Sequence, residues 1–139
     1  MNILIDTNVI IDFLLEREPQ IFKASEIFEL IRLDKIKAFT TASSITDIFY
    51  ITAKRLGKNQ ARYLIRQLLR LLDIISVDGN DCVEALDLPI DDYEDSLVLT
   101  CSRKVNVDYI ISGDADFLQV KSPYAQIITS DDFLLLMSK

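Results

Sequence analysis

The chain has 139 residues, half of them hydrophobic, a formal net charge of −7 and no histidine. This length suffices for a single domain spanning residues 1–139, and the scarcity of glycine and proline, three of each, excludes a disordered or fibrous chain. The absence of histidine excludes Ser-His-Asp and Cys-His catalysis and removes the commonest zinc ligand.

The amino terminus does not have the pattern of a secretion signal. No basic segment precedes the first apolar run, and Asp6 and Asp12 interrupt that run. No uncharged apolar stretch reaches the roughly 18 residues of a membrane span. Cys82 and Cys101 fit no metal-binding spacing, and we expect both to be buried thiols in a reducing compartment. These features predict a cytoplasmic protein that does not associate with a membrane.

The first third of the chain predicts two strands separated by two helices. Residues 2–5 are a short apolar run typical of a buried strand, and helical spacing of apolar residues follows over 6–15. A break at 16–19 precedes a longer helix that ends near Leu33. Residues 36–41 form the second predicted strand.

The middle of the chain predicts two long helices. Ser43 or Ser44 is the expected N-cap of the first helix, and Gly57 ends it. The second helix spans about 58–72 and has a stripe of apolar residues at helical spacing. This stripe consists of Leu64, Ile65, Leu68, Leu69 and Leu72.

The last part of the chain alternates short strands with helices. A third strand over 74–77 leads through a turn at 79–81 into a short helix ending near Leu88. Residues 92–104 are predicted to form another helix. The remaining predicted elements are strands at 108–112 and 126–129 and a terminal helix that starts at Ser130.

The order of these elements predicts the fold class. Strands of four or five apolar residues that alternate with helices are typical of a parallel sheet covered on both faces. Helices outnumber strands in this chain. The sequence therefore predicts an α/β fold, a three-layer α/β/α sandwich with a five-stranded, mainly parallel sheet.

Four acids can gather at the carboxyl-terminal edge of this sheet, where open α/β folds bind their ligands. Asp6 follows the first strand directly, in the segment NILIDTNVIIDFL. Asp114 follows the fourth strand in ISGDADF, with Asp116 two residues later. Asp47 and Asp95 stand in the first turns of helices that can begin at the same edge.

Several acids also have a purely structural interpretation. Asp47 stands three residues after Ser44, which is the spacing of a capping box, and Asp116 could cap a turn. The neighbours of Asp95 are expected to be structural, with an N-cap at Asp92 and a solvated face formed by Asp91 and Glu94. Asp6 is harder to explain in this way, because a carboxylate at the end of a buried strand needs donors or a cation.

A meeting of Asp6, Asp47, Asp95 and Asp114 would bring like charges together, which raises carboxyl pKa values unless cations are present. Oxygen ligands without His or Cys favour hard ions, so Mg²⁺ or Mn²⁺ is expected. Two such ions can hold a phosphodiester, generate hydroxide from water and stabilise the leaving oxygen. This chemistry requires no histidine.

Four segments of the chain together resemble the PIN domain family of metal-dependent ribonucleases. They are, in order, ILIDTNVIIDFL, SSITDIFYI, DYEDSLVLTCSR and YIISGDADFL. The resemblance covers essentially the whole chain. Many small bacterial and archaeal PIN proteins are the toxins of toxin–antitoxin pairs, of which the VapC type is best known.

The resemblance implies an endoribonuclease that uses Mg²⁺ or Mn²⁺ and metal-activated water, often as a homodimer and with a cognate antitoxin as a partner. By motif position, the implied metal ligands are Asp6, Asp47, Asp95 and Asp114, with Asp116 as an additional ligand and Asn8 and Ser112 as supporting residues. The family commonly has Glu as its second acid, and Asp47 is one methylene shorter. This difference leaves open an alternative, a catalytically weakened PIN-like module that binds RNA or protein.

Basic residues are concentrated in one segment. Residues 48–72 contain six cations and no acid, so this segment carries +6 and the rest of the chain −13, which together give the net −7. Three of the arginines recur every four residues, so they share a helical stripe opposite the leucines. The alternatives are an ordinary solvated face, a phosphate-contacting ridge or a docking site for an acidic partner. The six residues are Lys54, Arg55, Lys58, Arg62, Arg66 and Arg70.

Two other folds with acids at strand ends fit poorly. A receiver domain needs an acid pair after the first strand and an acceptor Asp after the third. Asp78 could mimic the acceptor, but Asp6 stands alone after the first strand. A phosphatase with an Asp nucleophile needs two acids in the pattern DxD, and the chain has DTN at this place.

Overall fold

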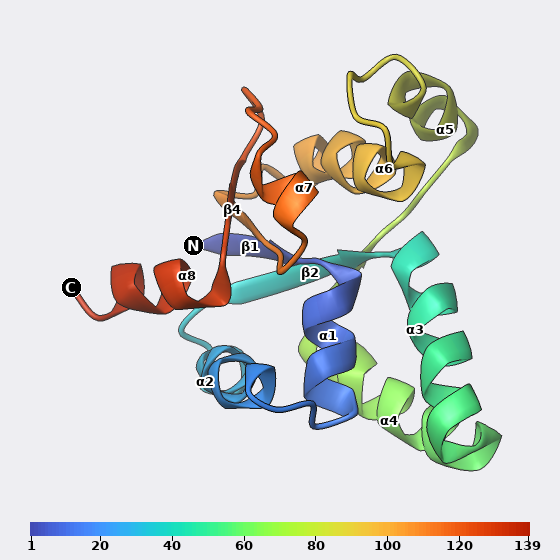
Figure 1. Ribbon diagram of the computed structural model, residues 1–139, viewed down its shortest axis with the longest axis vertical. Helices are drawn as coiled ribbons and strands as arrows, with labels where there is room; N and C mark the ends of the chain where they lie inside the picture. The colour runs from blue at the N-terminus through green and yellow to red at the C-terminus, as the bar shows by residue number, and fades with distance from the viewer.

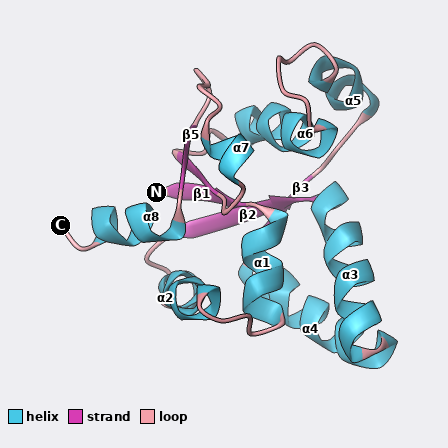
Figure 2. Ribbon diagram, viewed as in Figure 1, coloured by secondary structure: helices cyan, strands magenta, loops and turns pink.

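The structure is a computed structural model that describes residues 1–139. Five strands form one sheet in the order β3-β2-β1-β4-β5, and every neighbouring pair is parallel (Figures 1 and 2). The sheet is therefore parallel throughout. The strands are β1 (Asn2–Ile5), β2 (Lys37–Thr41), β3 (Asp73–Ile75), β4 (Tyr109–Ile111) and β5 (Gln126–Ile128).

Helices cover both faces of the sheet, which confirms the predicted three-layer sandwich (Figure 1). One layer consists of α1 (Thr7–Leu14), α2 (Gln20–Arg32), α3 (Ala42–Leu56), α4 (Lys58–Leu71) and α8 (Ser130–Met137). The other layer consists of α5 (Gly79–Ala85), α6 (Tyr93–Ser102), the 3₁₀ turn η1 (Arg103–Val105) and α7 (Ala115–Leu118). None of these helices combines the length and the apolar composition needed to cross a lipid bilayer.

Successive residues of each strand point to opposite faces, and this alternation builds two separate cores. On β1, Ile3 and Ile5 pack in a cluster of 18 buried residues under α1, α2, α3, α4 and α8. Leu4 packs on the other face, in a cluster of 13 buried residues with α5, α6 and α7. Both faces of β1 are buried, which explains why its sequence is continuously apolar.

Several helices begin directly at the carboxyl ends of strands, and polar side chains cap them. Asp6 caps α1, Asp114 caps α7, and the hydroxyl of Thr41 accepts from Ser44 N at 3.2 Å to cap α3. The predicted N-cap of α3 at Ser43 or Ser44 is therefore wrong. Because α3 begins at Ala42, Asp47 lies in the second turn, outside the reach of a capping box.

Some predicted burial also differs from the structure. The side chain of Phe22 is 61% exposed and that of Leu69 is 45% exposed, although both are near helical spacing with buried residues. Cys101 is buried as predicted, whereas Cys82 is exposed and neither forms a disulfide. Helical spacing alone overestimates the width of the buried stripe on α2 and α4.

The neighbouring strands β1 and β4 form the centre of the sheet. The chain proceeds from β1 towards β2 and β3 on one side and from β4 to β5 on the other, so a topological switch point lies between β1 and β4. Such a point is where open α/β sheets bind ligands, beyond the carboxyl ends of the strands. Asp6 N donates to the carbonyl of Ile111 at 2.9 Å, which places Asp6 at this point.

Candidate active site

Asp6 and Ser112 form the buried centre of the site. The Ser112 hydroxyl donates to Asp6 Oδ2 at 2.7 Å, and Thr7 N donates to Asp6 Oδ1 at 2.9 Å. Asp6 is only 4% exposed, and burial raises the pKa of its carboxyl above the ordinary value. The two hydrogen bonds lower this pKa, whereas the nearby charges of Asp114 and Asp92 raise it.

Asp95 lies in the first turn of α6, which packs against the same edge of the sheet. It is 7% exposed, and Asp95 N donates to the side chain of its N-cap, Asp92, at 3.0 Å. Burial is the largest cause that raises the pKa of Asp95 to about 7, followed by the charge of Asp6. Asp92 is an N-cap as predicted, and its charge also raises the pKa of Asp95.

Glu94 belongs to the site, and its predicted place on a solvated face is wrong. It is half-buried, and the Thr7 hydroxyl donates to Glu94 Oε1 at 3.1 Å. Burial first, and then a hydrogen bond and the charge of Asp47, raise the pKa of Glu94 to about 7. Glu94 therefore connects α6 to α1 through Thr7, and Asp47 on α3 is close enough to Glu94 to raise its pKa.

Asp114 and Asp116 line the outer part of the same edge. Asp114 Oδ1 accepts from Asp116 N at 2.8 Å, so Asp114 is the cap of α7 and Asp116 is not. Both side chains line a cavity of about 370 Å³ together with Asp91, Asp92 and Asp95. Asp91 and Asp116 are exposed at its rim.

The loop that carries Asp114 is held by two of the supporting residues. Asp114 N donates to the Ser112 hydroxyl at 3.0 Å, so this hydroxyl connects Asp6 to Asp114. Gly113 N donates to Asn8 Oδ1 at 3.2 Å. Asn8 and Ser112 therefore fix the position of the loop after β4 relative to the start of α1.

No basic side chain compensates these acids. None of the ion pairs of the chain involves Asp6, Asp47, Glu94, Asp95, Asp114 or Asp116. The contrasting case is Asp81, a buried carboxylate at which Lys104 Nζ lies 2.7 Å from Oδ2 and lowers the pKa. A buried acid with a lysine is stabilised as the anion, whereas Asp6 and Asp95 lie among other acids.

The chemistry of this donor set fits a hard divalent cation. All the side chains that gather at the edge supply oxygen atoms, and their summed negative charge is what Mg²⁺ or Mn²⁺ would compensate. No group of three or more acidic or cysteine side chains is already arranged to coordinate one ion. The structure thus brings Asp6, Asp95 and Asp114 within electrostatic range of one another and Asp47 beside Glu94.

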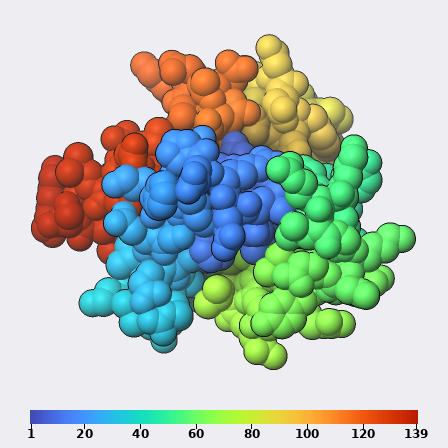
Figure 3. Space-filling view, turned by 60° about the horizontal axis from the view of Figure 1, so that its bottom comes forward, coloured from blue at the N-terminus to red at the C-terminus, as the bar shows by residue number.

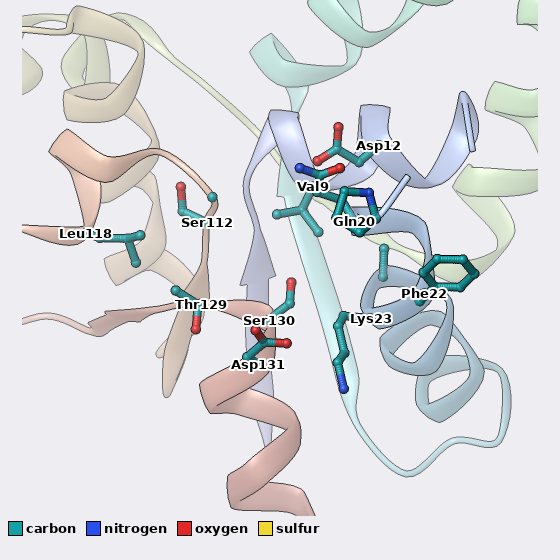
Figure 4. A pocket seen from close by; sticks show the side chains of 13 residues that line it. Val9, Asp12, Gln20, Phe22, Lys23, Ser112, Leu118, Thr129, Ser130 and Asp131 are labelled. Carbon is teal, nitrogen blue, oxygen red and sulfur yellow. The ribbon is translucent and has the colours of Figure 1, made fainter. Parts of the chain in front are cut away.

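A second cavity is lined in part by Ser112 and Gly113. It has a volume of about 410 Å³ and is bounded by α1, α2, the loop after β4 and the start of α8 (Figure 4). Val9 and Leu118 supply apolar surface, and Asp12, Lys23 and Asp131 supply charge at its border. The loop after β4 therefore contributes to both cavities, with Ser112 and Gly113 in this one and Asp114 in the acidic one.

The six basic residues predicted to contact RNA or a partner all lie on α3 or α4. All six are exposed, and none forms an ion pair. Arg62, Arg66 and Arg70 share the exposed face of α4, opposite the buried Ala61 and Ile65. Figure 3 shows this green pair of helices beside the blue surface of α1.

The sequence matches the family model described as the PIN domain over residues 2–116. The chain belongs to the PIN domain family. All four acids implied by the resemblance, together with Glu94, fall within the matched residues. A comparison of the sequence with functionally curated proteins gives no match.

Solved structures similar to this PIN domain share its fold at low sequence identity. The VapBC complex of Salmonella typhimurium bound to DNA has a chain with a TM-score of 0.68 and 12% identity, with 94% of this chain and 98% of that chain covered. VapC20 of Mycobacterium tuberculosis, described as a toxin that cleaves the sarcin–ricin loop, has a TM-score of 0.66 and 15% identity over 83% and 92% of the two chains. VapBC-1 of nontypeable Haemophilus influenzae has a TM-score of 0.66 and 16% identity over 94% and 99%.

Proposed function

We propose that this PIN domain is an endoribonuclease that hydrolyses RNA phosphodiester bonds with Mg²⁺ or Mn²⁺. The observation that carries the proposal is the group of acids at the switch point, of which Asp6 and Asp95 are buried without any basic partner. Isolated buried carboxylates are costly in a folded protein. A site for cations accounts for their presence together.

The residues that would hold the ions are Asp6, Asp47, Asp95 and Asp114, with Asp116 as an additional ligand. A bound divalent ion supplies a Lewis acid that lowers the pKa of water and stabilises charge on phosphate oxygens. Ser112 and Thr7 orient Asp6 through their hydrogen bonds, and orientation of ligands by such partners commonly strengthens a metal site. Glu94 joins these acids as a residue that orients Asp47.

RNA binding by an acidic protein requires a separate cationic surface. The basic face of α3 and α4, with Lys54, Arg55, Lys58, Arg62, Arg66 and Arg70, supports this role because its charges are exposed and unpaired. Phosphate contacts of this kind bind RNA without reading its sequence. This basic surface therefore does not determine which RNA sequence is cleaved.

We further propose that the protein is the toxin of a toxin–antitoxin pair and forms a homodimer. The similar chains of Salmonella typhimurium and Haemophilus influenzae belong to VapBC complexes, which supports a protein partner. Co-expression with a small DNA-binding protein encoded beside it tests this partner. The expected result is a stable complex without ribonuclease activity, and the contrary result is two proteins that elute separately.

Cleavage of a mixed pool of single-stranded RNA with Mn²⁺ tests the nuclease. The wild type is compared with Asp6→Asn, Asp95→Asn and the control Asp81→Asn, whose carboxylate is buried but ion-paired. The proposal predicts cleavage by the wild type and the control that EDTA abolishes, and loss of at least 100-fold in the two site variants. Equal background cutting by all four proteins contradicts it.

A second candidate function is a PIN-like module that binds RNA or protein without cleaving it. The observation that favours it is the short side chain of Asp47, which interacts with Glu94. RNA binding by the wild type without metal-dependent cleavage would support this function. If Asp47→Glu then cleaved RNA, the lack of activity in the wild type would result from the shorter side chain of Asp47.

A further inference from the structure

One face of α3 connects the acid cluster to the basic surface. Asp47, Tyr50 and Lys54 stand at positions i, i+3 and i+7, so their side chains project from the same face of the helix. With a rise of about 1.5 Å per residue, Tyr50 lies roughly 4.5 Å and Lys54 roughly 10.5 Å along the axis from Asp47. This face therefore leads from the candidate active site towards the end of α3.

Tyr50 has no partner within the protein. Its side chain is 66% exposed, more than that of any other tyrosine. Tyr124 and Tyr93 are also exposed but have partners, since Tyr124 lies under Arg103 and the Tyr93 hydroxyl donates to the carbonyl of Cys82. Tyr63 is exposed without a partner as well, but it lies on α4 and not on the face of α3 that carries Asp47. Tyr50 makes no ring contact and no side-chain hydrogen bond. An aromatic ring left free beside a polar site is available to stack on a planar group.

The distribution of unpaired cations indicates along which surface an RNA strand extends from the candidate active site. Five of the 15 Lys and Arg residues form ion pairs, and six of the remaining ten lie on α3 or α4. On the opposite layer, Arg103 and Lys104 are ion-paired, so Lys121 is the only cation between residues 76 and 125 that forms no ion pair. A nucleic-acid strand is therefore attracted more strongly along α3 and α4 than along the opposite layer.

We propose that Tyr50 stacks on a base of single-stranded RNA next to the cleaved phosphodiester and that Lys54 contacts a phosphate beyond it. The inference rests on the proposed nuclease function and adds the residues that bind an unpaired strand, because a paired base presents no free face to the ring. Stacking is tolerant of base identity, so Tyr50 supports binding of many sequences. Arg62, which lies 5.9 Å from the ring of Phe49, extends the cationic surface onto α4.

Binding of two labelled 12-nucleotide probes in EDTA separates stacking from phosphate contact without any cleavage. One probe is single-stranded RNA of mixed sequence, and the other is an abasic ribose-phosphate chain of equal length. Tyr50→Ala is expected to weaken binding of the RNA roughly tenfold and to leave binding of the abasic chain unchanged. Lys54→Ala is expected to weaken binding of both probes and to reduce the salt slope by about 0.7.

Matched controls come from the opposite edge of the sheet. Tyr124 precedes β5 and Lys35 precedes β2, so both lie at the amino-terminal edge, and both are exposed. Tyr124→Ala and Lys35→Ala are expected to bind both probes like the wild type. Equal weakening by Tyr124→Ala and Tyr50→Ala overturns the proposal, as does a loss in Tyr50→Ala that is the same for RNA and the abasic chain.

The oligomeric state and the cleavage activity of Tyr50→Ala complete the test. Its sedimentation is expected to match that of the wild type; a lost dimer with unchanged RNA binding would assign this face to a second copy of the chain and overturn the inference. Manganese-dependent cleavage distinguishes failure of the proposed nuclease function from failure of the proposed stacking role of Tyr50. A wild type that binds RNA through Tyr50 but never cleaves contradicts the nuclease only, whereas full cleavage and binding by Tyr50→Ala contradicts the stacking role only.

Discussion

The Ser112 hydroxyl donates to Asp6 Oδ2 at 2.7 Å and accepts from Asp114 N at 3.0 Å. These residues follow the neighbouring strands β1 and β4, and 106 positions of sequence separate Ser112 from Asp6. One buried hydroxyl thus fixes the position of two acids at the switch point. Ser112 thereby connects the two central strands of the sheet to the proposed metal ligands.

Ser112→Ala is expected to weaken binding of Mn²⁺ by roughly 10- to 100-fold, because Asp6 loses the donor that orients it. The change is also expected to lower the free energy of unfolding by about 1–3 kcal/mol. Ser102→Ala is the matched control, since Ser102 is equally buried and donates to the carbonyl of Leu99 at 2.6 Å, away from the site. Titration calorimetry and thermal unfolding measure the two effects, and equal metal affinity in both variants would contradict the role of Ser112.

The metal-free protein is expected to lose stability as the pH rises from 5.5 to 7.5. The pKa of Glu94 and that of Asp95 are raised to about 7 in the folded chain, whereas both groups titrate near pH 4 when unfolded. The folded state therefore binds more protons across this window, and its free energy of unfolding falls as the pH increases. Thermal unfolding in EDTA should show a Tm a few degrees higher at pH 5.5, and a Tm that rises with pH would contradict this account.

Asp95→Asn is expected to stabilise the metal-free protein at pH 7.5 while it abolishes cleavage. The substitution removes a buried charge that Asp6 and other acids repel, and relief of this kind commonly contributes about 0.5–2 kcal/mol. Asp81→Asn should do the reverse, with a loss of about 1–3 kcal/mol, because it leaves Lys104 without its partner. Thermal unfolding of both variants in EDTA checks the prediction, and a lower Tm for both would show that Asp95 is structural.

Asp47→Asn is expected to lower the pKa of Glu94 towards its ordinary value. A hydrogen bond with Asp47 and the charge of Asp47 both raise this pKa, and the substitution removes the charge. The carboxyl carbon signal of Glu94 in a ¹³C NMR titration measures the change in the metal-free protein. An unchanged midpoint near pH 7 would leave burial and the charge of Asp6 as the causes and would remove the link between Glu94 and Asp47.

Much of the fold is predictable because its signals are local. The apolar run of β1 is buried on both faces, Gly57 ends α3 with a φ of 90°, and alternating strands and helices require a parallel sheet. The cap of α3 was not predictable in this way, because Thr41 reads equally well as the last residue of a strand. The exposure of Phe22 depends on which parts of α2 the neighbouring helices leave uncovered.

The place of an acid is easiest to predict where it follows a strand. Asp6 directly follows β1, and Asp114 follows β4 after two residues, so both are visible in the sequence. Asp95 was predicted from its place in the first turn of a helix. Glu94 was missed because its partners are distant, with Thr7 87 positions away and Asp47 on a third helix. The signal available in the sequence was the density of acids at 91–95. The structure shows that this run does more than solvate a helix, because Asp95 is buried.

Binding of Mn²⁺ at pH 7.5, followed by the decrease of the free-ion EPR signal, is the most direct measurement of the claim that these acids form a metal site. The account predicts saturable binding by the wild type and by Asp81→Asn, and a loss of at least tenfold in affinity in Asp6→Asn and Asp95→Asn. Equal affinity in all four proteins, or no saturable binding by the wild type, would contradict it.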